Sequence, residues 1–112
     1  MFKTLLLLLA LAVPLAHAER IGSIMGIGAT PCGDYVAWRE SKTGGRAAQA
    51  HALQWTWGYI SAHNLYGTEP QVTAIPSPAS IGLYLEKYCR EHPLDKLITG
   101  VVHLMEEINT KK

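Results

Sequence analysis

Residues 54–64 read QWTWGYISAHN and lie inside a long predicted helix, which we place at residues 46–66 because alanines crowd its first half. Successive residues of a helix are turned by about 100°, so Trp55 and Trp57 point about 200° apart. Both rings can be buried only if the helix has neighbours on two sides. The stretch therefore predicts the central helix of an all-α protein.

Gly58 and Ala62 stand four residues apart in this helix and lead to a prediction about packing. A glycine inside a helix costs about 1 kcal/mol relative to alanine, so it usually lets another backbone come close. We expect a neighbouring segment to cross at Gly58 and Ala62, and Gly100 to have the same role in a later helix. Gly67 should end the central helix in the left-handed conformation.

Two further helices are predicted from cap residues. Thr30 and Ser77 are suitable N-caps, and each is followed by a proline, which suits the first helical position. The first helix should span residues 31–41, and the third should span residues 78–92.

A fourth helix is expected to begin at Pro93 and to end near residue 109, with a clear helical apolar period. Its apolar stripe is Leu94, Leu97, Ile98, Val101, Leu104, Met105 and Ile108. The loop after the central helix could hold one short extended piece around residues 72–75. The predicted fold class is all-α, a small four-helix orthogonal or antiparallel bundle.

The first 18 residues have the three parts of a secretory signal peptide. Lys3 supplies the positive charge, residues 5–15 form the apolar stretch, and Ala16-His17-Ala18 is a small-x-small cleavage site. The apolar stretch is short for a transmembrane helix. We predict cleavage after Ala18 and a location in the periplasm or outside the cell.

The two cysteines, Cys32 and Cys89, are an even pair in this exported chain, which is typical of a disulfide. Closing the loop between them is worth about 4 kcal/mol in the loop-entropy treatment. A redox-active pair is disfavoured because the cysteines lack the Cys-x-x-Cys spacing. We predict a Cys32–Cys89 disulfide that ties the first helix to the third.

The mature chain is predicted to consist of an extended N-terminal arm at residues 19–30, one helical domain at 31–109 and a frayed tail at 110–112. Glycines in the arm argue against a helix, and its isoleucines argue against free solvation. The chain has 10 Lys and Arg against 9 Asp and Glu, and loss of Lys3 leaves it neutral apart from histidines. A neutral chain has no long-range field for nucleic acid or anionic lipid, so we expect neither as a partner.

Candidate catalytic and metal-binding groups do not converge on the predicted helices. His51 and His63 lie about 120° apart around the central helix, too far to share a metal. Ser61, His63 and Asp34 can be written as a triad, but Ser61 and His63 point away from each other. We therefore expect no catalytic residue, no metal site and no cofactor.

Three groups of residues resemble a known family. The matching motifs are Cys32-x-x-Tyr35, then Trp57-Gly58-Tyr59-Ile60 with Asn64, then Ile81-x-x-Tyr84-Leu85-x-x-Tyr88-Cys89-x-x-x-Pro93-Leu94. They resemble small periplasmic disulfide-tied helical proteins, the HdeA-like and Rap/Tai-type (type VI secretion immunity) group, over residues 32–108. The matching residues are structural, so the resemblance implies a fold more than an activity.

The resemblance implies two functions. Immunity-type relatives imply an inhibitor that sequesters a toxic effector, and HdeA-like relatives imply an acid-stress chaperone that holds unfolded clients. The chaperone would use groups that gain charge at low pH, namely His51, His63, His92 and His103. We expect a non-enzymatic periplasmic protein-binding domain of the immunity type, with the chaperone as the alternative and an enzyme ranked last. The partner is another protein, effector or client, and a homodimer stays open.

Two sets of residues follow from these arguments. The expected structural core includes Trp55, Trp57, Gly58, Tyr59, Tyr88 and Pro93. The expected partner surface lies in the arm and in the loop after the central helix, because such segments adapt most readily to a partner. Its residues are Ile24, Met25, Ile27, Gln71 and Val72.

Overall fold

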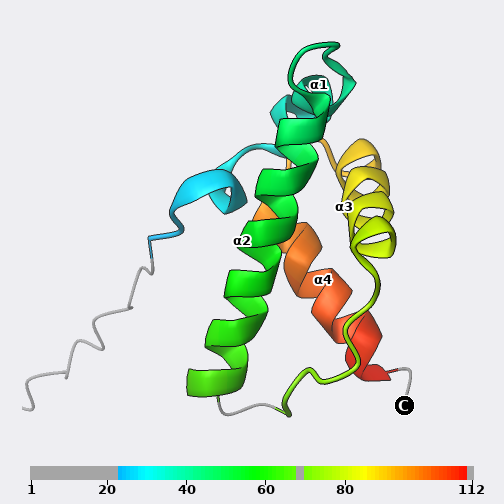
Figure 1. Cartoon of the computed structure of the whole chain (residues 1–112). Helices are drawn as coiled ribbons and strands as arrows, with labels where there is room; N and C mark the ends of the chain where they lie inside the picture. Colours follow the sequence, from blue (N-terminus) through cyan, green and yellow to red (C-terminus); the bar gives the residue numbers. More distant parts are fainter. Residues whose placement is uncertain (1–22, 68–69, 111–112) are drawn as a thin grey trace, which may run out of the picture.

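The computed structural model describes residues 23–67 and 70–110 and shows an all-α protein (Figure 1). The elements in chain order are a 3₁₀ helix η1 (Gly26–Ala29) and the helices α1 (Cys32–Glu40), α2 (Gly45–Tyr66), α3 (Pro78–Glu91) and α4 (Leu97–Thr110). Within these ranges there is no β-strand, and no helix has the length and apolar character needed to cross a bilayer. The predicted four-helix fold is confirmed, whereas the predicted leader (1–18) lies outside the described residues.

Helix α2 is the central element, and it packs against η1, α1 and α3 (Figure 1). Its buried positions recur every fourth residue and are Ala48, Ala52, Thr56 and Ile60. The buried Thr56 hydroxyl donates to the Ala52 carbonyl at 2.7 Å, so no polar group is left unpaired there. Trp55 and Trp57 flank this stripe, and both are half-buried against the core.

Helices α3 and α4 supply most of the large buried side chains. These recur at the helical period and are Ile81, Leu85 and Tyr88 on α3, with Leu97, Val101, Leu104 and Met105 on α4. Gly100 lies against the Tyr88 ring, because a Cβ at position 100 would stand 2.8 Å from Tyr88 Cδ1. A close approach was expected at Gly100, and what comes close is a ring rather than a backbone.

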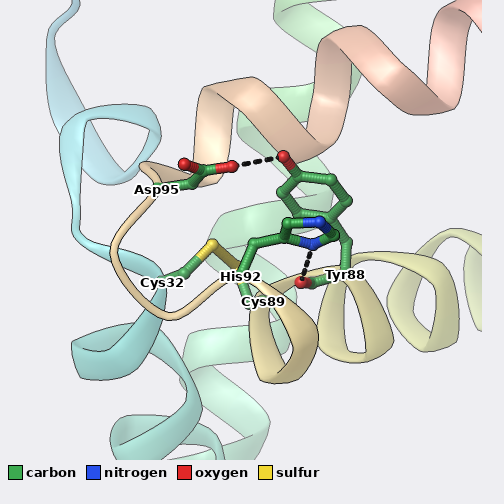
Figure 2. The surroundings of a disulfide bond; sticks show 5 residues. All are labelled: Cys32, Tyr88, Cys89, His92 and Asp95. Carbon is green, nitrogen blue, oxygen red and sulfur yellow. Dashed lines mark hydrogen bonds between the residues drawn. A yellow bond between two sulfur atoms is a disulfide. The ribbon is translucent and has the colours of Figure 1, made fainter.

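Cys32 and Cys89 are joined by a disulfide, and both are fully buried (Figure 2). The bond ties the start of α1 to the end of α3, as predicted. Residues 93–97 complete this region, and together with the disulfide they are called the disulfide junction below.

Three backbone hydrogen bonds reinforce the disulfide junction. The first N–H groups of a helix have no partner inside it. Here the loop before α4 supplies acceptors for α1, and Thr30 supplies one for α4. The bonds run from Cys32 N–H to the Asp95 carbonyl, from Gly33 N–H to the Pro93 carbonyl, and from Leu97 N–H to the Thr30 carbonyl, at 2.7, 3.0 and 2.9 Å.

These bonds explain why α4 begins at Leu97 rather than at Pro93. The carbonyls of Pro93 and Asp95 accept from α1, so residues 93–96 form a turn that serves the junction. Pro93 was expected in the core and is exposed. Leu94 was expected on the apolar stripe of the fourth helix and is 96% exposed.

Two glycine predictions are wrong. Gly58 is exposed, and a Cβ placed there would meet no described residue within 4 Å, so no segment of residues 23–67 and 70–110 crosses α2 at this point and Gly58 is not part of the described core. Gly67 has a φ of −78° and is not left-handed. Its N–H donates to the His63 carbonyl at 2.8 Å, which ends the helix without a special conformation.

The segments outside the four helices also differ in detail from the predictions. The described part of the N-terminal arm is not fully extended, because it contains η1. Gly26 has a φ of 74°, a conformation open to glycine, and it begins that turn. Residues 70–77 form no strand.

Candidate functional site

The candidate catalytic residues of α2 are engaged with the backbone. The Ser61 hydroxyl donates to the Trp57 carbonyl at 2.7 Å, and the His63 ring lies 3.2 Å from the Pro70 carbonyl. The two side chains therefore do not form a nucleophile–base pair. Over residues 23–67 and 70–110, no three His, Cys, Asp or Glu side chains gather in a way that could hold a metal.

The second half of α2 exposes a surface without charge. Between residues 54 and 66 the sequence has no Asp, Glu, Lys or Arg, yet Leu65 is 73% exposed and Tyr66 is 85% exposed. Outward-facing helix surfaces normally carry charged and polar residues, so this composition is unusual. We call this surface the α2 face, and its residues are Trp55, Gly58, Tyr59, Ala62, Leu65 and Tyr66.

The N-terminal segment is fixed to one end of the α2 face by Trp55. The indole N–H donates to the Met25 carbonyl at 2.8 Å. Gly28 is buried beneath the same ring, where a Cβ would stand 2.1 Å from Trp55 Cζ2. Ile24 and Met25 are left 36% and 75% exposed, so they extend the apolar surface beyond α2.

Only some residues of the expected partner surface are exposed. Ile24, Met25 and Gln71 are exposed, whereas Ile27 is half-buried against the core. Val72 is 1% exposed and cannot contact a partner in this structure. Its burial follows from contacts with α2 that sequence reasoning did not foresee.

Those contacts come from Asn64, whose side chain pairs with the backbone of Val72. The Asn64 amide donates to the Val72 carbonyl at 2.9 Å, and the Val72 N–H donates to Asn64 Oδ1 at 2.8 Å. Gln71 adds a bond from its amide to the Asn64 carbonyl at 3.1 Å. The Asn64 side chain therefore pairs with the Val72 backbone as a neighbouring β-strand would. This pairing holds the chain after α2 against the end of the helix.

Two hollows lie beside α2, one facing α4 and one facing the N-terminal segment. The first is a pocket of about 480 Å³ between the C-terminal halves of α2 and α4, and the second is a hollow of about 370 Å³ beside Met25 and Trp55. The pocket is called the α2–α4 groove below, and Tyr59 separates it from the hollow. Its lining also includes His63, Val102, Met105, Glu106 and Asn109. The Trp55 and Tyr59 rings stack with their centroids 5.3 Å apart.

The surface shared by α1 and α3 is charged. Arg39 lies 3.3 Å from Glu86, while Arg90 lies 2.9 Å from Glu86 and 2.6 Å from Glu40. The hydrogen bond from Arg90 is the main cause that lowers the pKa of Glu86. These ion pairs hold α1 and α3 together and contrast with the uncharged α2 face.

Tyr88 sits at the centre of a polar cluster beside the disulfide. Its hydroxyl donates to Asp95 Oδ2 at 2.5 Å, and its ring stacks between those of His92 and His103 (Figure 2 shows Tyr88, His92 and Asp95). Burial, followed by the bond to Asp95, raises the pKa of Tyr88 to about 12. The phenol therefore keeps its proton at neutral pH, and the cluster fixes the loop before α4 rather than transferring protons.

The α2–α4 groove was not predicted from the sequence. Met105 was assigned to the apolar stripe of the fourth helix, but nothing placed it opposite Tyr59. The sequence signal that could have pointed to this surface is the absence of charge over residues 54–66.

No protein-family model matches this chain, and no curated protein or solved structure matches it either.

Proposed function

We propose that this protein is a non-enzymatic, exported protein-binding domain and that the α2 face is its binding surface. The supporting observation is that Leu65 and Tyr66 are exposed on a helix half that carries no charged residue. The cores of protein interfaces are depleted in charge and enriched in aromatic residues and methionine. Apolar surface gathered in this way on a small domain is typical of an interaction site.

Within this class we propose an immunity-type inhibitor that sequesters a toxic effector in the periplasm. The rigid framing of the surface supports this choice. Trp55 fixes the segment that carries Met25, and Asn64 fixes the chain after α2. A surface ordered before binding loses little conformational entropy on binding, which suits tight sequestration.

Photo-crosslinking in the producing cells tests the proposal. A benzophenone amino acid replaces the exposed Ala62 on the α2 face, and the control places it at Lys87, which is exposed on α3. We expect position 62, but not position 87, to give a covalent adduct with one defined second protein. No adduct at position 62, equal adducts at both positions, or adducts only with a second copy of this chain would contradict the proposal.

The acid-stress chaperone has less support. His51, His92 and His103 are exposed and His63 is half-buried, so none of these imidazoles is buried in the described core. Suppression of aggregation of a model client at low pH, together with no adduct from position 62, would reverse this preference.

A further inference from the structure

The shape of the α2–α4 groove points to a helical occupant. Figure 1 shows α2 and α4 diverging toward their C-terminal ends, and the pocket of about 480 Å³ lies between those ends. A groove between two helices is the shape that a third helix fills, with its apolar face turned inward. The part of the chain that the structure describes has no sheet edge, so pairing with an extended peptide strand is not offered there.

The lining of the groove determines which side chains can enter. On the α4 wall Val102 is half-buried and Met105 is 6% exposed, whereas the other lining residues, Glu106, Asn109 and Thr110, are polar. The Tyr59 ring stands between the pocket and the hollow beside Trp55. From Val102 to Thr110 the α4 wall is about 12 Å long, which matches about two turns of a helix. Such an occupant presents aliphatic side chains spaced one turn apart.

Charge in the groove is confined to one residue. Of the described residues that line the pocket and the hollow, Glu106 alone is an Asp, Glu, Lys or Arg. Its side chain is 67% exposed and lies 3.7 Å from His103. A carboxylate at the rim of an apolar groove favours a cation at the matching edge of the occupant and disfavours an anion.

We propose that the α2–α4 groove binds an amphipathic helix of a partner protein, which packs leucine-like side chains against Tyr59 and Val102 and presents a lysine or arginine to Glu106. This inference rests on the proposed function and specifies the chemistry of the partner. A second copy of the chain is less suitable, because the α2 face has no lysine or arginine to offer to Glu106.

Fluorescence anisotropy with labelled model peptides tests this proposal. Two peptides of about 14 residues, four helical turns, share leucines at helical spacing and differ only in their polar positions, which are lysine in one and glutamate in the other. We expect the purified protein to bind the lysine peptide about fivefold more tightly, the value of one exposed charge pair. Glu106→Lys should reverse this order.

The matched control is Glu91→Lys, which makes the same charge change at an exposed position on α3 and should leave the order intact. Equal affinity for the two peptides, or an order that Glu106→Lys does not alter, overturns the proposal. Peptide-induced NMR shifts should centre on Tyr59 and Val102. Shifts centred on Leu83 of α3 instead, or self-association of the free protein through Tyr59 and Val102, also overturn it.

The crosslinking and peptide experiments fail separately. An adduct from position 62 without discrimination between the peptides leaves the protein-binding function standing and removes the helical occupant. Discrimination between the peptides without any adduct keeps the groove chemistry and removes the proposed partner in the producing cell.

Discussion

The disulfide junction and the α2 face are built in opposite ways. The junction lies near α1, whereas the α2 face extends to the far end, where α2 and α4 finish (Figure 1). At the junction a buried disulfide, three backbone bonds and the Tyr88–Asp95 pair fix every segment. On the α2 face, Tyr66 is 85% exposed and a Cβ at Gly58 would meet nothing.

This difference indicates that folding stability and binding depend on different parts of the molecule. Substitutions of the buried groups at the junction should lower the free energy of unfolding. Substitutions on the exposed α2 face should not lower that free energy, and replacing its exposed side chains should alter partner binding instead. The following experiments test whether stability and binding depend on different parts of the molecule.

The largest effect is expected at the disulfide. The double variant Cys32→Ala/Cys89→Ala should lose about 4 kcal/mol of unfolding free energy, because the unfolded chain regains the entropy of an open loop. Urea unfolding of the variant and the parent measures the difference. A loss below about 1 kcal/mol would show that the other contacts of the junction suffice.

Gly28→Ala should have the next largest effect. The new Cβ would stand 2.1 Å from Trp55 Cζ2, so η1 must move away from the indole. Overpacking of this kind costs about 2 kcal/mol, to be read from urea unfolding and from the changed fluorescence of Trp55. The control is Gly33→Ala, whose Cβ would have an ordinary 3.4 Å contact with the Pro93 carbonyl. Equal effects of the two variants would contradict the packing of η1 described above.

The Tyr88–Asp95 pair predicts a loss of stability in alkali. The pKa of Tyr88 is raised to about 12, whereas a tyrosine in an unfolded chain titrates near pH 10. Between about pH 10 and pH 12 the folded protein keeps a proton that the unfolded chain has lost, so stability falls as pH rises through that range.

Tyr88→Phe should therefore lower by one the number of protons released on unfolding over this pH range. Urea unfolding at several pH values measures this number. Burial and Glu107 also raise the pKa of Tyr84 to about 12. Tyr84 should therefore keep its own contribution to the pH dependence of stability in that variant. An unchanged dependence in Tyr88→Phe would mean that neither burial nor the bond to Asp95 raises the pKa of Tyr88 in the folded protein.

Gly58→Ala should give a smaller effect of opposite sign. The added methyl meets no other group and alanine favours the helix, so unfolding should cost about 1 kcal/mol more. Thermal unfolding followed by circular dichroism measures this gain. Destabilisation at this exposed position would show that something packs against Gly58.

The four helices could be predicted from local periodicity and breakers, but of the two predicted caps only Ser77 is correct, because α1 begins after Pro31 and Thr30 does not cap it. Ser77 accepts a hydrogen bond from Ser80 N–H and is followed by Pro78, as its sequence indicates. The start of α4 could not be predicted, because the carbonyls of Pro93 and Asp95 accept hydrogen bonds from α1, which is distant in the sequence.

The same limit applies to the candidate surface. The uncharged run at residues 54–66 is visible in the sequence. The hydrogen bond from Trp55 to Met25, which fixes the start of η1, joins residues thirty positions apart and is not. Val72 was assigned to the surface because only the fold brings Asn64 to its backbone. The α2–α4 groove likewise depends on how two helices diverge, which no local pattern specifies.

The central claim is that the exposed residues of the α2 face serve binding rather than folding. The most direct test measures unfolding free energy and crosslinking from position 62 together in the double variant Leu65→Gln/Tyr66→Gln, with Leu94→Gln at the junction as the control. We predict that both variants change stability by less than about 0.5 kcal/mol and that only the double variant loses the adduct. A double variant that unfolds readily, or that keeps the adduct in full, would contradict the claim.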